Sequence, residues 1–108
     1  MNSTKAKIFI RIILPLLYND KTPIERSLFL KTKEELHDTF GGKTELVPTT
    51  GSWKDEMGRL YEEPSAGFEV IADKTDETIE FLKSYKKKLK DRFKQDDIMI
   101  TYYPINVI

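Results

Sequence analysis

The chain contains no cysteine, and this absence removes several kinds of chemistry at once. Disulfide bonds, thiolate metal sites and a cysteine nucleophile all need a thiol, so none of them can operate here. The lack of cysteine leaves the compartment open, and we take a cytoplasmic location as the default expectation. A net charge is also absent: 18 basic residues balance 18 acidic ones, so no global field draws the protein to nucleic acid or anionic lipid.

Long hydrophobic runs and metal-ligand patterns are missing as well. The most apolar stretch, residues 8–17, is interrupted by Arg11 and is far too short to span a bilayer as a helix. We therefore read it as a buried strand and expect no membrane partner. His37 is the only histidine and has no ordered carboxylate pattern around it, so we expect neither a metal nor another cofactor. The run Gly41–Thr44 lacks the earlier glycine of a phosphate-binding loop.

The 108 residues form one domain, in which two helices are expected. The first falls within residues 23–40, and its start is ambiguous: the proline at position 23 suits a first helical residue, but Thr32 and Glu35 also spell a capping box for a shorter helix. The second helix can be capped by Asp73 or Thr75. Its apolar stripe is Leu82, Tyr85, Leu89 and Phe93.

Four strands are expected from the period-two patterns. They are Lys7–Leu14, Thr44–Trp53, a third strand that starts near Arg59, and Ile98–Tyr103. Pro48 favours an edge position or a bulge for the second strand, and Pro64–Gly67 is expected to break or bend the third before it resumes at Phe68–Ala72. The β-α-β-β-α-β order predicts an α+β, ferredoxin-like fold. Right-handed connections would give a four-stranded antiparallel sheet, ordered 4-1-3-2, with both helices on one face.

The segment Gly51–Pro64 reads as a β-hairpin that carries the only tryptophan. Asp55 and Gly58 suit the first and fourth positions of a type I turn. That turn would place Lys54 opposite Arg59, Trp53 opposite Leu60, and Gly51 opposite Glu62. Trp53 and Glu62 would then share one face of the hairpin, with room left beside Gly51. The alternative is that Trp53 is a packing anchor and the charges only solvate the hairpin.

Glu62 and Glu63 are the candidate catalytic acids. Adjacent residues on a strand point to opposite faces, so the two cannot act as one carboxylate pair. At most one enters a pocket, where burial by Trp53 or Tyr61 would raise its pKa toward a useful range. No second catalytic partner is visible in the sequence.

Arg11 stands in the middle of the most hydrophobic segment, on the strand face away from the helices. In the expected topology Glu69 lies on the same face of the neighbouring strand, so an ion pair between the two is the structural interpretation. The functional interpretation is a bidentate anion site that Arg11 forms with Tyr103 or Thr101 of the last strand.

The second helix is rich in lysine, which raises the question of a nucleic-acid interface. These lysines surround the helix outside its apolar stripe, and aromatic residues are not interleaved for base stacking. A solvated helix face is therefore the better interpretation, and nucleic acid is not an expected partner.

Three short motifs, Phe40-Gly41-Gly42, Gly51-Ser52-Trp53 and Tyr61-Glu62-Glu63-Pro64, resemble a pattern found in small uncharacterised microbial proteins. The resemblance implies a ferredoxin-like domain of unknown function. It carries no catalytic assignment that could be transferred to this chain.

These observations predict a small soluble binding or interaction domain that uses its open sheet face and the Trp53 hairpin. We expect a homodimer, because helices on one face would leave Phe9, Ile13, Ile71, Met99 and Tyr103 uncovered on the other. A small anionic ligand is a further candidate partner. Its expected binding residues are Arg11, Trp53, Arg59, Tyr61 and Tyr103. Two alternatives stay open: a small-molecule enzyme with Glu62 or Glu63 as general acid or base and an arginine holding the substrate, and a nucleic-acid binder that uses the second helix.

Overall fold

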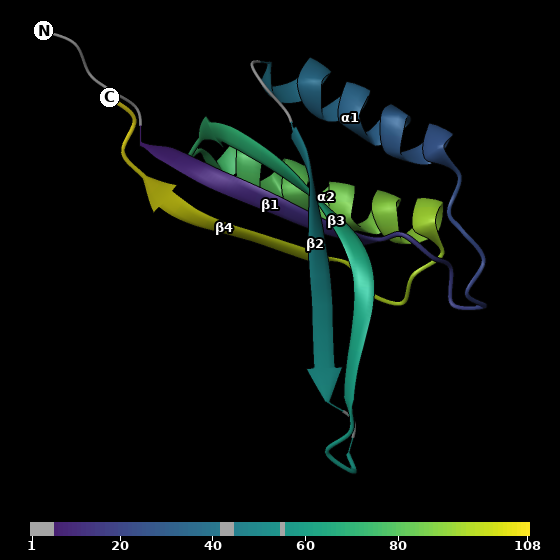
Figure 1. Cartoon of the computed structure of the whole chain (residues 1–108). Helices are drawn as coiled ribbons and strands as arrows, with labels where there is room; N and C mark the ends of the chain where they lie inside the picture. The colour runs from purple at the N-terminus through teal and green to yellow at the C-terminus, as the bar shows by residue number, and fades with distance from the viewer. Residues whose placement is uncertain (1–5, 42–44, 55) are drawn as a thin grey trace, which may run out of the picture.

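Strands and helices alternate along the chain in the order that the sequence patterns predict. A computed structural model describes residues 6–41, 45–54 and 56–108, with residues 45–53 and 61–63 described by their backbone alone. The elements are β1 Lys7–Pro15, α1 Arg26–Phe40, β2 Glu45–Lys54, β3 Leu60–Asp73, α2 Asp76–Phe93 and β4 Met99–Ile105 (Figure 1).

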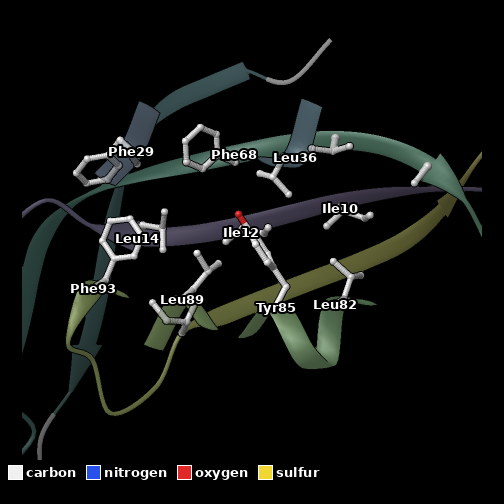
Figure 2. Close-up of a cluster of buried hydrophobic side chains, with 14 of the residues drawn as sticks. Ile10, Ile12, Leu14, Phe29, Leu36, Phe68, Leu82, Tyr85, Leu89 and Phe93 are labelled. Carbon is white, nitrogen blue, oxygen red and sulfur yellow. The ribbon is translucent and has the colours of Figure 1, made fainter. Parts of the chain in front are cut away.

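The core forms between the two helices and one face of β1 and β3. Alternate side chains of β1 are fully buried, as its period-two pattern predicts: Ile8, Ile10, Ile12 and Leu14 are all 0% exposed. Phe29 and Leu36 of α1 meet Phe68 and the apolar stripe of α2 across this face (Figure 2). The predicted stripe is confirmed, since Leu82, Tyr85, Leu89 and Phe93 are all buried.

The helix ends follow local chemistry. Thr75 caps α2 by accepting a hydrogen bond from the Thr78 backbone N–H at 3.1 Å, so Thr75 and not Asp73 is the cap. Helix α1 begins at Arg26, so neither predicted start is right. Its last residue is Phe40, and the next residue, Gly41, caps it: the φ of +66° suits glycine, and the Gly41 N–H donates to the His37 carbonyl at 2.7 Å.

The sheet has the strand order β2-β3-β1-β4, and all of its pairings are antiparallel. All four strands lie side by side only across Gly67–Glu69 of β3, where β2 pairs on one side and β1, with β4 beyond it, on the other. Across Val70–Asp73 the described sheet is three strands wide, and across Leu60–Pro64 it is a two-stranded arm. The fold is α+β and its strands follow the predicted order 4-1-3-2. The predicted ferredoxin-like sheet, four strands wide beneath two helices, is corrected, because the part of the sheet that β1 and β3 form together is three strands wide over most of its length.

Strand β3 runs without interruption through Pro64–Gly67, so of the two predicted outcomes, a break or a bend, the break is wrong. Ser65 is the last β3 residue that pairs with β1, and Pro64 lies just outside this pairing. No hydrogen bond to β1 therefore requires the backbone N–H that proline lacks. Its carbonyl accepts a hydrogen bond from the Leu16 N–H at 3.2 Å. Pro48 lies on β2, which is an edge strand as predicted.

The two-stranded arm gives the molecule an elongated shape. It projects from the body, and the molecule extends over 56 × 32 × 22 Å (Figure 1). The radius of gyration is 15.4 Å, whereas a compact domain of this size has about 13 Å. Within the described part of the chain, neither helix combines the length and apolar character needed to cross a bilayer.

Candidate functional site

A cavity of about 410 Å³ lies where the end of α1, the last residues of β3 and the start of α2 meet. Small-molecule sites generally occupy about 300–1,000 Å³, so a compact ligand would fit. The β3 part of the wall is Ile71–Asp73, the stretch beside which β2 no longer pairs. The cavity therefore lies beside the part of β3 that follows its described pairing with β2.

One wall of this cavity is aromatic. Phe40 is the last residue of α1, and Phe81 lies in the second turn of α2; their rings meet edge to face with centroids 5.3 Å apart. The face of Phe81 also stacks on Tyr85 at 5.0 Å, which holds the ring in place. A rigid aromatic wall of this kind suits a flat, apolar ring in a ligand.

The cavity also has polar lining residues. Lys7 at the start of β1 and Asp73 at the end of β3 form an ion pair, and both side chains remain partly exposed. The hydroxyl groups of Thr75 and Thr78, which hydrogen-bond to each other at 3.0 Å, line the same cavity at the start of α2. Ammonium, carboxylate and hydroxyl groups therefore surround an aromatic wall, which provides both stacking and hydrogen-bonding positions for one ligand.

The structure places Arg11 and Tyr103, two of the predicted binding residues, on the open face of the sheet. The ion pair predicted for Arg11 is present: its Nε lies 3.6 Å from Glu69 Oε2. Tyr103 stacks on Phe9 with ring centroids 5.3 Å apart. Thr101 is the β4 residue opposite Arg11 in the sheet register. The open face thus holds the residues proposed for an anion site, but an acidic side chain already stands beside the arginine.

The predicted hairpin register is wrong by one residue. Trp53 lies opposite Tyr61, Gly51 opposite Glu63, and Ser52 opposite Glu62. Trp53 and Glu62 therefore belong to opposite faces of the hairpin, because paired residues share a face. The predicted four-residue turn is in fact a five-residue connection between Lys54 and Leu60, with Gly58 at φ +78°.

The side chains of Trp53, Tyr61, Glu62 and Glu63 lie outside the described residues, and so does the predicted space beside Gly51. Arg59 is exposed in the connection that precedes β3. Glu63 lies six residues before Glu69, which pairs with Arg11, and this separation is roughly 20 Å along an extended strand. One chain therefore does not bring Arg11 together with either candidate acid.

The most constrained polar group was missed by the sequence reasoning. Arg92 of α2 is almost fully buried and holds Glu35 of α1 through two hydrogen bonds of 2.6 and 2.9 Å. Tyr85 donates to the same carboxylate at 2.8 Å, Lys88 lies 3.1 Å from it, and Thr32 accepts from Arg92 at 2.9 Å. Leu28, Thr32, Leu36 and Phe40 recur every four residues in α1, and this pattern marks Thr32 as inward-facing. No local pattern links Glu35 to Arg92, which lies 57 positions away.

This network shifts the protonation of its members. The Arg92 guanidinium, assisted by Tyr85 and Lys88, lowers the pKa of Glu35 to about 2. Burial and the hydrogen bond to Glu35 raise the pKa of Tyr85. Glu35 therefore stays ionised in its folded environment, and its fixed pairing joins the two helices. A structural clamp is the direct consequence of this geometry.

Several α2 lysines are paired with acids, which bears on the nucleic-acid alternative. The ion pairs are Lys83 with Glu80 at 3.2 Å, Lys86 with Asp97 at 3.0 Å, and Lys88 with Glu35 at 3.1 Å. Their positive charge is partly compensated within the chain. His37 is exposed on α1, and no group of three metal-ligating side chains occurs in the part of the chain that is described.

Comparison with known proteins gives a likeness in fold. No protein-family model and no curated protein matches the chain. Among solved structures, a phage SAM lyase in complex with S-methyl-5′-thioadenosine has a TM-score of 0.67 at 17% identity, covering 99% of this chain and 95% of the lyase. The apo form has a TM-score of 0.64 at 18% identity, covering 96% and 85%. B. subtilis GlnK in complex with ATP has a TM-score of 0.62 at 14% identity, again covering 96% and 85%. At these identities the chain shares their α+β fold.

Proposed function

We propose that the protein is a small ligand-binding domain whose ligand contains an adenosine group and occupies the cavity beside Phe40 and Phe81. The observation that carries this proposal is the cavity itself, which combines an aromatic wall with an ion pair and two hydroxyl groups. The names of two structures of similar fold support the ligand class, because S-methyl-5′-thioadenosine and ATP both contain adenosine.

The cavity has suitable chemistry for each part of such a ligand. Adenine is flat and packs against an aromatic ring, an interaction worth about 1–3 kcal/mol per base in other proteins. The hydroxyl groups of Thr75 and Thr78 and the carboxylate of Glu77 can hydrogen-bond a ribose. Lys7 can attract an anionic group if it exchanges its partner Asp73 for the ligand.

Titration calorimetry with S-methyl-5′-thioadenosine and with ATP tests this proposal. We expect at least one of them to bind and GTP to bind more weakly, and we expect Phe81→Ala to weaken binding about 5- to 150-fold through the lost stacking. Lys7→Gln should selectively weaken ATP. Tyr102→Ala removes an exposed aromatic from β4 and serves as the control. No heat of binding for either compound at millimolar concentration would contradict the proposal.

A second candidate function is the enzymatic one, favoured by a lyase structure that covers 99% of this chain. In that case S-adenosylmethionine would be the substrate, and Glu62 or Glu63 would act as the general acid or base. Incubation with S-adenosylmethionine, followed by chromatography for S-methyl-5′-thioadenosine, tests this function directly. We expect Glu62→Gln or Glu63→Gln to lower the rate of release. Product formation no faster than in a protein-free control would argue against it.

We also propose that the domain works as an assembly in which a second copy covers the open sheet face. This face carries Phe9 and Ile13 together with three strongly exposed apolar side chains: Ile71 at 48%, Met99 at 59% and Tyr103 at 54%. Side chains of this kind side by side on a sheet favour burial against another surface. A specific interface buries about 1,200–2,000 Å² in total.

A further inference from the structure

An ion pair stands among the apolar residues of the open face, which also carries Thr101 beside Arg11 and the Lys7–Asp73 pair at its end. Arg11 lies between Phe9 and Ile13 on β1, and its partner Glu69 lies opposite it on β3. The pairing is incomplete: Arg11 Nε is buried but has no hydrogen-bond acceptor among the described residues, since Glu69 Oε2 at 3.6 Å is beyond hydrogen-bond distance. Glu69 is itself only 28% exposed. The face thus holds a donor and an acceptor that do not satisfy each other.

The arrangement of these two charges indicates what can cover the face. A free anion attracted by Arg11 would also meet the carboxylate of Glu69, so the site does not suit a small anionic ligand. A second copy brings both a guanidinium and a carboxylate within the same apolar surroundings. Such a face is complementary to itself, because Arg11 of each copy can lie opposite Glu69 of the other copy.

We propose that Arg11 and Glu69 form reciprocal contacts between copies, with the terminal guanidinium nitrogens of Arg11 donating to the Glu69 carboxylate of a second copy, since the Arg11 side chain is 36% exposed although its Nε is buried. This inference rests on the proposed assembly through the open face and names the residues that make it specific. Within an apolar surface, a charged pair that meets correctly selects one arrangement, whereas like charges that meet prevent association.

The proposal predicts a particular response to charge reversal. Arg11→Glu places two acids on every copy, and Glu69→Arg places two bases on every copy. Each variant alone should repel its own kind. When the two variants are mixed, an acidic face meets a basic one, and the contacts between copies are restored with opposite partners. A role confined to one chain predicts no such rescue, because mixing leaves each chain's own pair broken.

Sedimentation velocity over a range of concentrations, from micromolar to several hundred micromolar, tests this inference. We expect the wild type to associate, each charge-reversal variant to associate at least tenfold more weakly, and the equimolar mixture to recover the wild-type behaviour. Lys31→Glu on α1 changes an exposed charge away from the face and is the matched control. Circular dichroism of each variant as a monomer establishes that it is folded.

The outcomes distinguish the role of Arg11 and Glu69 from the assembly itself. If the wild type associates but the single variants associate equally well, or the mixture does not recover, the role of Arg11 and Glu69 is overturned and the assembly stands. A wild type that stays monomeric at several hundred micromolar overturns the assembly and this inference together. Ligand binding at the Phe81 cavity is measured on the same samples and is judged independently.

Discussion

Replacing Arg92 by alanine is expected to destabilise the domain by about 3 kcal/mol, the lower end of the range for breaking a buried ion pair. The reason is that Arg92 is only 8% exposed and makes two hydrogen bonds to Glu35 and one to Thr32. Its removal leaves the Glu35 carboxylate between two helices with Lys88 and Tyr85 as remaining partners. Urea denaturation followed by circular dichroism measures the effect.

The same network predicts a specific pH dependence. The pKa of Glu35 falls from 4.5 to about 2 on folding, so the folded state favours the ionised carboxylate. The resulting stability is complete above about pH 4.5 and is lost as the pH falls toward 2. Its size is about 3 kcal/mol, because one pKa unit corresponds to about 1.4 kcal/mol. Glu35→Gln should remove most of this pH dependence of the free energy of unfolding.

Glu34→Gln is the matched control for that experiment. Glu34 is the neighbouring glutamate on α1 and is exposed, so its substitution should change the free energy of unfolding by less than about 0.5 kcal/mol. Two results would show that the Glu35–Arg92 ion pair does not stabilise the domain in solution. One is an equal effect of Glu34→Gln and Glu35→Gln on the free energy of unfolding, and the other is an unchanged loss of stability at acidic pH in Glu35→Gln.

Leu36→Ala is expected to cost about 2–5 kcal/mol, because it removes buried methyl groups and leaves a cavity. Leu36 is 0% exposed and faces β1 and β3 in the centre of the core (Figure 2). Leu30 lies on the same helix and is 49% exposed, which makes Leu30→Ala a control with the same chemical change. Its expected cost is below about 1 kcal/mol. Chemical denaturation of both variants compares them, and similar midpoints would contradict the assignment of the core.

Local patterns determined much of the architecture. The alternation of β1 identified its buried face, and the spacing in α2 identified its buried stripe. The cap of α2 was narrowed to Asp73 or Thr75, and the structure selects Thr75. Gly41 is a typical residue to end a helix, and it follows the last residue of α1. Even the Arg11–Glu69 pair followed from the expected topology, since both residues face away from the helices on neighbouring strands.

The hairpin shows where sequence reasoning reached its limit. A one-residue difference in the length of the connection between Lys54 and Leu60 moved Glu62 to the face opposite Trp53. The number of strands beside each part of β3 could not be predicted either. Alternation of apolar and polar residues along a strand indicates which face is buried, but it does not indicate how many strands lie next to it. The cavity beside Phe81 lies along the part of the described sheet that is three strands wide.

The sequence by itself therefore determined the element order, the core faces of β1 and α2, and the exclusion of thiol chemistry. Only the tertiary structure decided the hairpin register, the width of the sheet, the cavity at its narrow end and the Glu35–Arg92 clamp. The physical reason is the separation along the chain over which each interaction acts. Propensity, capping and periodicity act between residues a few positions apart, whereas these features join side chains that approach only after the helices have packed on the sheet.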